Sequence, residues 1–231
     1  IFFLAAKTPG RRLALDAFER IADSRAGLPL RVLELVARDK ACEHPDKACH
    51  GDSCPLARGF YDRLPHARSA AVSHANGRAL DKAALREVAL AHHVCPYYLS
   101  QDLVAWSDVV VGDYNYYFDR SAMLYGLTQL NGWRISVLVD EAHNLYSRAC
   151  SMYSADLSRA ETAAVRAELP GMLRRPADEV LNQWDVLVME AQRSEPVQAW
   201  SLLKGPPDAW LRSLQRFNSA VGEYLNDHAA D

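Results

Sequence analysis

The feature that most constrains the fold is an apolar run that ends in two carboxylates, residues 137–143, with the sequence VLVDEAH. A continuous apolar run of this kind predicts a strand buried in a parallel sheet. Ligands of such sheets bind at the carboxyl ends of the strands, where Asp140 and Glu141 would lie. In nucleotide hydrolases a carboxylate at this place holds the Mg²⁺ that bridges the terminal phosphates, and a neighbouring Glu orients the attacking water. The run therefore predicts a magnesium ligand in Asp140 and a catalytic role for Glu141.

His143 follows the acidic pair and, by analogy with other nucleotide-driven motors, would act with it by sensing the state of the nucleotide. A simpler interpretation is that Asp140 only caps a helix beginning near Asn144, since Asp is a favoured N-cap. The phosphate-binding (Walker A) loop G-x-x-x-x-G-K-[ST] is absent from the 231 residues. Two explanations stay open: the loop precedes Ile1, as an apolar opening without Met suggests, or the protein does not hydrolyse ATP.

Strands and helices alternate along the first two thirds of the chain. The spacing of apolar residues predicts strands over residues 1–6, 30–36, 109–112 and 135–139, and helices over residues 11–22, 81–93 and 97–106. Such alternation is typical of an α/β layer architecture. A separate helical module is expected from three further helices, over residues 158–169, 177–192 and 207–225. No apolar run approaches the roughly 18 residues that a membrane helix needs, so no membrane segment is expected.

Residues 40–76 differ in composition, because Cys, His, Pro, Gly and Asp crowd together and the apolar periodicity fades. A segment with so few apolar side chains needs a cross-link in place of a large core. The chain offers four thiols, separated by six, four and forty residues: Cys42, Cys49, Cys54 and Cys95. Thiolates suit zinc or an iron-sulphur cluster, and His44 and His50 could complete a mixed zinc site. The residues alone leave both metals open, and the fifth cysteine, Cys150, is expected to be a packing residue.

The charge balance excludes attraction to nucleic acid over the whole surface. Lys and Arg total 26 against 29 Asp and Glu, which gives a net charge of −3, so any nucleic-acid path must be local. Single-strand binding combines basic side chains with aromatic platforms. The candidates are Arg58, Arg63 and Arg68 and the rings of Phe60, Tyr61, Tyr97, Tyr98, Trp106, Tyr114, Tyr116 and Tyr117. Alternatively, the rings belong to a core, and Arg58 and Arg63 pair with Asp52 and Asp62 at the surface.

The acidic box and the four-cysteine insertion together resemble the superfamily 2 DNA helicases of the XPD and DinG type. Similar segments occur in the same order: residues 3–10 (FLAAKTPG), the end of the insertion at residues 95–98 (CPYY), residues 109–118 and residues 137–145. The resemblance covers most of residues 1–155. The helical tail corresponds to the arch domain of that family by its position.

For the fold, the resemblance implies an α/β class: part of a RecA-like P-loop motor domain with an inserted iron-sulphur domain and a following all-helical, arch-like domain. The implied boundaries are residues 1–38 and 97–155 for the motor domain, 39–96 for the iron-sulphur cluster domain and 156–231 for the arch-like domain. The four cysteines would hold a [4Fe-4S] cluster. By the resemblance, Lys7 and Thr8 would contact the DNA strand. Arg58 and Arg63 are expected to bind DNA only because they are basic residues beside aromatic rings.

For the function, the resemblance implies ATP-dependent 5′-to-3′ unwinding in DNA repair or replication, with ATP and Mg²⁺ as further cofactors. The implied partners are single-stranded and forked DNA and the remaining helicase domains of the same full-length chain, with no membrane partner. The isolated chain is expected to be inactive because the Walker A loop is absent. A composition rich in Ala and Arg favours a bacterial, DinG-like member that is cytoplasmic and associated with the nucleoid.

Two alternative functions stay open. One is a non-catalytic iron-sulphur or zinc module that binds DNA without the Walker A loop. The other is a nuclease with an iron-sulphur cross-link, for which Asp113 and Asp119 lack the accompanying D/E-x-K pattern.

Overall fold

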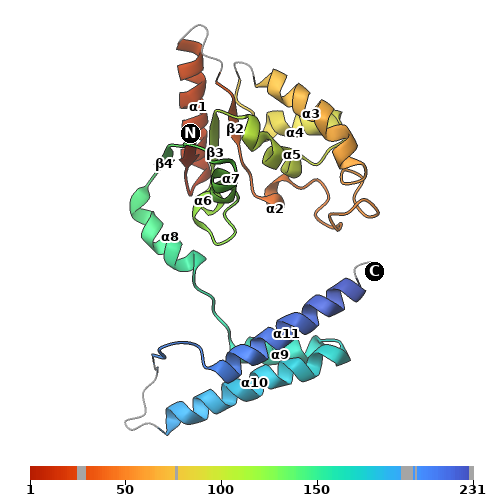
Figure 1. The fold of residues 1–231 in the computed structure, drawn as a ribbon, viewed down its shortest axis with the longest axis vertical. Helices are drawn as coiled ribbons and strands as arrows, with labels where there is room; N and C mark the ends of the chain where they lie inside the picture. Colours follow the sequence, from red (N-terminus) through yellow and green to blue (C-terminus); the bar gives the residue numbers. More distant parts are fainter. Residues whose placement is uncertain (25–29, 76–77, 194–199, 201, 229–231) are drawn as a thin grey trace. The chain divides into compact units, whose positions relative to one another are not determined.

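The computed structural model describes residues 1–24, 30–75, 78–193, 200 and 202–228. The chain divides into two compact units, residues 1–154 and residues 155–231 (Figure 1). Each unit has its own packing. The first contains all the strands of the described chain, and the second consists of helices.

The first unit is built on a four-stranded parallel sheet with the order β2-β3-β1-β4. Its strands are β1 (Phe2–Leu4), β2 (Val32–Glu34), β3 (Val109–Gly112) and β4 (Val137–Val139). In the register, Phe2 lies opposite Val110 of β3 and Val137 of β4. All four predicted strands are confirmed; β3 has the predicted bounds, and the other three are shorter than their apolar runs.

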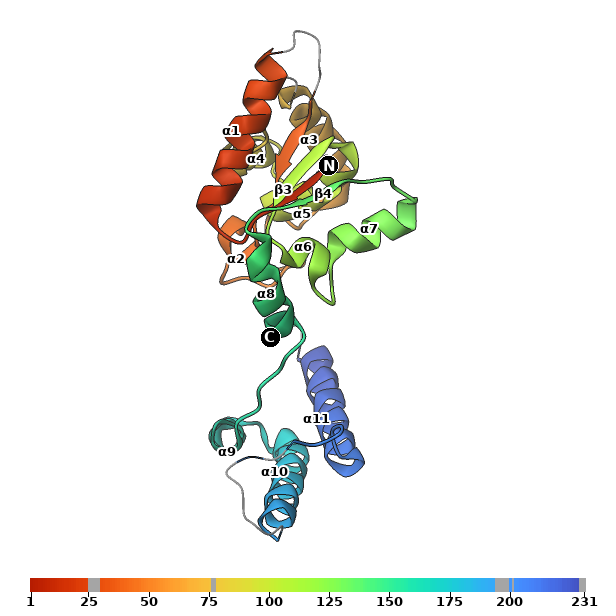
Figure 2. The ribbon, with the colours of Figure 1, turned by 90° about the vertical axis from the view of Figure 1, so that its left-hand side faces the viewer.

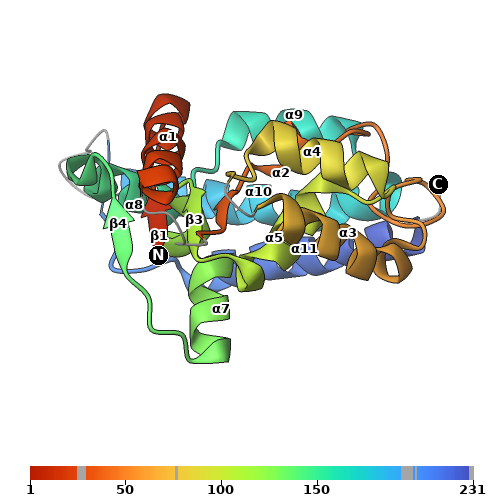
Figure 3. The same cartoon turned by 90° about the horizontal axis from the view of Figure 1, so that it is seen from above.

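An inner strand and an edge strand of the sheet differ in burial. All four residues of β3 are buried, as expected for a strand inside a parallel sheet. By contrast β4 lies at the edge of the sheet (Figure 3), and its central residue Leu138 is 45% exposed. The prediction that the strand before the acidic box is buried is therefore wrong for the described chain, because only β1 pairs with it there.

Helices cover both faces of the sheet. On one face α1 (Thr8–Ser24) packs Ala14 and Leu15 against Val109 and Val111 of β3. The opposite face is covered by α3 (Phe60–His74), α4 (Lys82–Ala91) and α5 (Pro96–Leu103), and the alternate residue Val110 points into this second core (Figure 1). Because successive side chains of β3 point to opposite faces of the sheet, this strand contributes residues to both cores.

Shorter helices follow the strands at their carboxyl ends, as Figure 2 shows for α2, α6 and α8. The remaining elements of this unit are α2 (Arg38–Ala41), η1 (Val104–Trp106), α6 (Asn115–Phe118), α7 (Met123–Asn131), η2 (Ala142–Asn144) and α8 (Leu145–Met152). Because the strands are parallel, the segments after β1, β2, β3 and β4 all begin at one edge of the sheet. This carboxyl edge is the region of interest for function.

The helix α3 was not predicted, since residues 40–76 were expected to lack apolar periodicity. Its buried face consists of Leu64, Ala67 and Ala71, which follow one another at helical spacing. Two of these three residues are alanines, so the apolar stripe is narrow and the sequence signal weak. The predicted helix that follows is confirmed: the side chain of Asp81 caps α4 by accepting a hydrogen bond from the N–H of Ala84 at 2.9 Å.

The second unit contains α9 (Arg159–Glu168), α10 (Gly171–Gln192) and α11 (Asp208–Asp227), as the apolar spacing predicted. Leu173, Ala177 and Val180 form the buried face of α10, which begins six residues before the predicted start at residue 177. The rings of Trp184 and Trp210 meet edge to face at 5.6 Å between centroids. None of the helices in the described residues is long and apolar enough to cross a membrane.

Candidate functional site

The acidic box begins at the carboxyl edge of the sheet. The N–H of Asp140 donates a 2.9 Å hydrogen bond to the carbonyl of Leu4, so Asp140 directly continues the pairing of β4 with β1. Its carboxylate lies against the first turn of α1, because a Cβ atom on Gly10 would come within 2.5 Å of Asp140 Oδ2. A helix N-terminus favours a carboxylate or a bound anion. Glycine at position 10 therefore allows the carboxylate to approach this helix end.

The other two side chains of the box face solvent. Glu141 is 60% exposed and His143 is 73% exposed, and His143 Nδ1 lies 3.3 Å from Glu141 Oε2. Glu141 has a φ of +50°, a left-handed conformation that a non-glycine residue rarely adopts. Backbone strain of this kind is common where a side chain is aimed at a ligand.

The structure does not support the interpretation of Asp140 as a helix cap. The positions before η2 and α8 belong to Glu141 and Asn144, and neither side chain makes a capping hydrogen bond. Asp140 instead precedes both helical segments. Its carboxylate is left available at the edge of the sheet.

A buried tyrosine holds the backbone of the box. The hydroxyl of Tyr114 donates to the carbonyl of Asp140 and lies 3.2 Å from the carbonyl of Glu141. Its side chain is fully buried, and burial followed by the negative charges of Asp140 and Glu141 raises its pKa. The prediction of Tyr114 as a platform for DNA bases is therefore wrong, because the ring belongs to the core.

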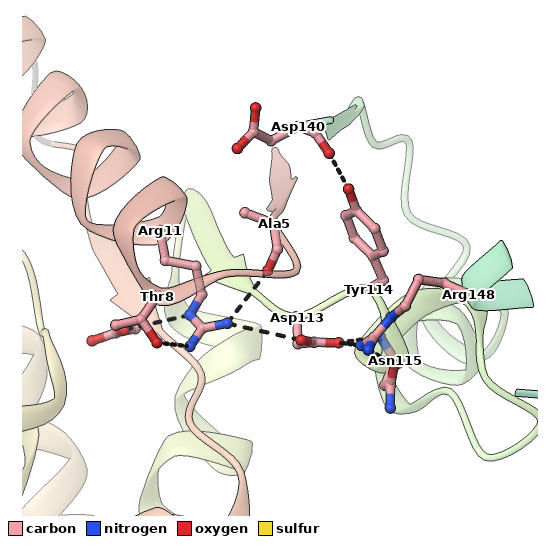
Figure 4. Close-up of polar contacts among 9 residues, drawn as sticks. Ala5, Thr8, Arg11, Asp113, Tyr114, Asn115, Asp140 and Arg148 are labelled. Carbon is pink, nitrogen blue, oxygen red and sulfur yellow. Dashed lines mark hydrogen bonds and ion pairs between the residues drawn. The ribbon is translucent and has the colours of Figure 1, made fainter. Parts of the chain in front are cut away.

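An arginine that the sequence did not single out lies at the same edge (Figure 4). Arg11 donates to the carbonyl of Ala5 at 3.3 Å and to Thr8 Oγ1 at 3.1 Å. Its guanidinium also lies 3.8 Å from Glu34 Oε1 and 3.9 Å from Asp113 Oδ2, and its side chain is only 11% exposed. These partners follow or end β1, β2 and β3. Arg11 thus links the ends of three neighbouring strands.

The network extends to the helix after the acidic box. Arg148 Nη2 on α8 donates to Asp113 Oδ1 at 2.9 Å and to Asn115 Oδ1 at 3.1 Å (Figure 4). A signal for Asp113 was present in the sequence, since it follows an apolar strand as Asp140 does. The arginine partners had no such local signal, because they lie on helices distant in the sequence.

The predicted DNA-contacting pair lies at this edge as well. Lys7 and Thr8 are exposed and mark the start of α1, next to the carboxylate of Asp140 that approaches Gly10. A neighbouring cavity of about 380 Å³ is bordered by segments after β2 and β3. Charged and aromatic groups line it, among them Arg11, Arg38, Lys40, Tyr97, Asp113 and Arg148. The structure therefore brings the acidic box and the predicted strand-contacting residues to one edge.

Cys95 lies at the N-terminus of α5, where the sequence returns from the insertion. Burial raises the pKa of its thiol, negative charge on Cys42 and Cys54 acts in the same direction, and the N–H groups of Tyr98 and Tyr97 oppose both. Among the described residues, no group of three or more His, Cys, Asp or Glu side chains is arranged to hold a metal ion.

The two remaining cysteines are exposed. Cys49 belongs to the loop and influences Tyr98, whose pKa is raised by burial first and then by Cys49. Cys150 lies on α8 and is exposed, so the prediction that it is a packing residue is wrong. No residue of α8 is fully buried, and the residues of this helix that pack against the core are Leu145 and Met152.

The predicted DNA-binding arginines of the insertion bind backbone carbonyls. Arg58 Nε donates to the carbonyl of Gly51 at 2.9 Å, and Arg63 donates to the carbonyls of His93 and Arg58. In the described part of the chain neither forms the ion pair with a neighbouring Asp that the sequence allowed. Arg58 therefore makes a contact within the cysteine loop, whereas Arg63 of α3 connects the end of the loop to the segment before Cys95.

The other candidates for DNA contact are Arg68 and the aromatic residues, and their side chains differ in exposure to solvent. Arg68 forms a two-point ion pair with Asp102 at 2.7 and 2.8 Å and lies over the ring of Trp106. Rings with large exposed areas are those of Tyr61, Tyr98 and Trp106. Burial raises the pKa of Tyr116, so its ring is one of those covered by the protein.

Comparison with known sequences identifies relatives over the region that contains this edge. The sequence pattern described as DEAD_2 matches residues 22–162, more than half of the chain. The "Fanconi anemia group J protein homolog" of Gallus gallus is 27% identical over 164 residues, which cover 64% of this chain and 13% of that protein. The "Regulator of telomere elongation helicase 1 homolog" of Anopheles gambiae is 29% identical over 153 residues, 60% of this chain and 15% of that protein. The chain thus spans about one seventh of the length of these relatives.

A shorter region is similar to another relative, and the whole chain is similar to two solved structures. The "ATP-dependent DNA helicase CHL1" of Candida glabrata is 37% identical over 68 residues, 29% of this chain and 8% of that protein. The structure titled "Truncated XPD" has a TM-score of 0.51 at 17% identity, over 98% of this chain and 64% of that one. "XPD_Helicase" has a TM-score of 0.52 at 15% identity, over 98% and 39%. The expected parallel-sheet fold of an XPD-like motor domain is confirmed.

Proposed function

The chain belongs to the DEAD_2 family, and on that premise we propose that it is part of the first motor domain of an ATP-dependent DNA helicase of the XPD type. The observation that supports this most directly is the position of Asp140. Its carboxylate lies at the carboxyl edge of a parallel sheet and against the N-terminal turn of α1. That is the place where a magnesium-bound nucleotide is held in motors of this architecture.

In this proposal each residue of the box has one task. Asp140 would hold Mg²⁺, which supplies charge stabilisation to the phosphates when it is bound with ATP. Glu141, which is exposed beside it, would orient the attacking water. His143, within 3.3 Å of Glu141, would sense whether that carboxylate is engaged. The Walker A loop does not occur in the 231 residues, so we assign the cradle for the phosphates to the remaining domains of a full-length protein.

DNA is the proposed partner, as single strands and forks. Lys7 and Thr8 are exposed at the same edge as the box, so a strand in contact with them would lie close to the nucleotide. The relatives named as helicases support this substrate, and one of them is named as an ATP-dependent DNA helicase. We further propose 5′-to-3′ polarity, a task in DNA repair or replication, and a bacterial, DinG-like origin in the nucleoid.

For the inserted segment we propose a [4Fe-4S] cluster held by the thiolates of Cys42, Cys49, Cys54 and Cys95. One observation agrees with this donor set: the loop buries little apolar surface and so needs a cross-link. The cluster would cross-link the loop to the start of α5. The proposed domains are residues 1–38 and 97–155 (motor), 39–96 (cluster) and 156–231 (arch-like).

The absence of a Walker A loop from the 231 residues favours one competing function, a non-catalytic module that binds DNA through a zinc or iron site. The two proposals differ in a measurable way. Only the helicase requires Asp140 and Glu141 for activity.

The test uses the full-length protein, purified without oxygen. We expect ATP hydrolysis that single-stranded DNA stimulates, unwinding of forks with a 5′ tail, and about four iron atoms per chain with visible absorbance. Hydrolysis should be lost in Asp140→Asn. DNA binding without any hydrolysis would support the non-catalytic module, and zinc in place of iron would contradict the cluster.

A further inference from the structure

The turn between β3 and α6 contains two consecutive residues that contact different functional parts of the motor. Tyr114 is fully buried, and its hydroxyl donates to the backbone carbonyl of Asp140 and lies near that of Glu141. Its neighbour Asp113 contacts two arginines instead (Figure 4). Because the residues are covalently adjacent, a displacement of one moves the other.

The carboxylate of Asp113 is shared between two helices. Its Oδ1 accepts a 2.9 Å hydrogen bond from Arg148 on α8, the helix that follows the acidic box. Its Oδ2 lies 3.9 Å from Nη1 of Arg11 on α1, the helix that begins beside Lys7 and Thr8. The acidic box is therefore connected to Asp113 in two ways, through the neighbouring residue Tyr114 and through Arg148 on the helix that follows the box.

Arg11 connects this carboxylate to the first turn of α1. It donates to the carbonyl of Ala5 and to Thr8 Oγ1, so its position determines how that turn is held. The buried Nε atom of Arg11 has no hydrogen-bond partner in the described residues. Glu34 Oε1 lies 3.8 Å from this Nε, and Asp113 Oδ2 lies 3.9 Å from Nη1 of the same guanidinium. These distances are those of ion pairs and are too long for hydrogen bonds. The guanidinium can thus move toward either carboxylate and gain a hydrogen bond there.

We propose that Asp113 is the positioning residue that couples the acidic box to the strand-contacting turn at Lys7 and Thr8. When nucleotide binding shifts the box, Tyr114 and Arg148 move the Asp113 carboxylate. Arg11 then moves toward Asp113 if that carboxylate comes nearer, and toward Glu34 if it withdraws. Asp113 touches no reacting atom, so its contribution is to coupling. This inference rests on the proposed function, because it needs both a nucleotide site and a strand-binding turn.

Two properties support a coupling role for Asp113. Its side chain is 27% exposed and Arg11 is 11% exposed, so solvent screens their interaction less than it screens a surface pair. Removing the charge of Asp113 leaves the guanidinium groups of Arg11 and Arg148 without the carboxylate that they share. Coupling between two sites in proteins commonly changes an affinity by roughly 5- to 150-fold, which sets the effect that can be measured.

The experiment compares Asp113→Asn with the wild-type full-length protein in ATP hydrolysis, with and without single-stranded DNA. We expect basal hydrolysis within about twofold of wild type and a stimulation by DNA that is smaller by roughly tenfold. Asp113→Glu, which keeps the charge, should recover most of the stimulation. Asp119→Asn is the matched control, since Asp119 lines the same cavity and its side chain accepts a local hydrogen bond from the N–H of Arg120.

A second variant, Arg148→Gln, guards against a folding defect because Arg148 is 40% exposed. It should reduce the stimulation in the same direction. Unchanged stimulation in both variants would overturn the proposal, as would a parallel loss of basal and stimulated hydrolysis, which indicates a merely structural role. A wild-type protein without DNA-stimulated hydrolysis would overturn the proposed function itself, and this inference with it.

Discussion

The acidic box and the cysteine loop are both candidate sites of one compact unit, yet they are held in different ways. The box follows a strand of the sheet, and hydrogen bonds to Leu4 and from Tyr114 fix its backbone. In the loop, residues 42–59, the only buried side chain is that of Leu56. The first site is therefore formed by the fold before a ligand arrives, whereas the second would depend on the proposed cluster.

The hydrogen bonds of the loop agree with this difference. Most of its backbone bonds span three or four residues, such as those from Cys54 to His50 and from Arg58 to Cys54. A longer connection is the two-point ion pair between Glu43 of the loop and Arg86 of α4, at 2.6 and 2.7 Å. Bonds within turns order the chain locally but do not fix the distance between remote thiols. A metal or cluster shared with Cys95 would supply that restraint.

The largest expected effect is therefore at the loop. Cys95→Ser should abolish the iron content and reduce unwinding by about a hundredfold or more, because the restraint on the loop is lost. Nucleotide binding by the full-length protein should persist, since the sheet does not depend on the loop. Iron quantitation, a fork-unwinding assay and nucleotide titration measure the three quantities.

Cys150→Ser is the matched control, because Cys150 is exposed on α8 and is expected to leave unwinding unchanged. Unwinding by an iron-free Cys95→Ser protein would remove the distinction between the two sites.

At the box the expected effect is on chemistry alone. Glu141→Gln should lower ATP hydrolysis by roughly a hundredfold or more, as for the loss of a group that activates water. Because Glu141 is 60% exposed, the melting temperature and iron content should stay those of the wild type. Glu168→Gln, at an exposed position of the second unit, serves as the control. Hydrolysis at the wild-type rate in Glu141→Gln would refute the assignment.

A smaller effect is expected from shortening a leucine, one in the sheet and one in the cysteine loop. Leu33 is fully buried in β2 and Leu56 is 8% exposed in the loop. Leu33→Ala should destabilise the sheet by about 2–5 kcal/mol, because it leaves a cavity in a packed core. Leu56→Ala should affect the loop alone. Hydrogen exchange of the full-length protein separates the outcomes: all four strands should lose protection in the first variant, and residues 42–59 in the second.

The smallest expected effect concerns thiol reactivity in the metal-free protein. Cys49 and Cys150 are exposed, whereas Cys95 is half-buried and burial raises its pKa. A thiol with a raised pKa stays protonated at a pH where an ordinary thiol is already a thiolate, which is the reactive form. Iodoacetamide at pH 8 should therefore modify Cys95 last, and its rate should keep increasing at higher pH. Mass spectrometry would monitor the modification of each thiol. Early modification of Cys95 would show that the loop leaves this thiol accessible to the reagent.

Some of the architecture was predictable because the patterns that encode it are local. A short apolar run followed by Asp indicates a strand and its carboxyl end, and this located both Asp140 and the strand before it. The helix α4 was predictable for a similar reason, since Asp81 is a favoured cap before an apolar stripe. The helix α3 was missed because its buried face uses small alanines, which barely differ from a polar face in hydrophobicity.

The class of fold and the position of the acidic box could be read from local sequence patterns, as could the four cysteines proposed to bind a cluster. The edge position of β4, the burial of Tyr114 and the meeting of Arg11, Asp113 and Arg148 followed only from the folded structure. The physical reason is that strand order, and not strand composition, determines burial and neighbours. Asp113 lies 35 residues from Arg148 in sequence, and no periodic pattern relates them.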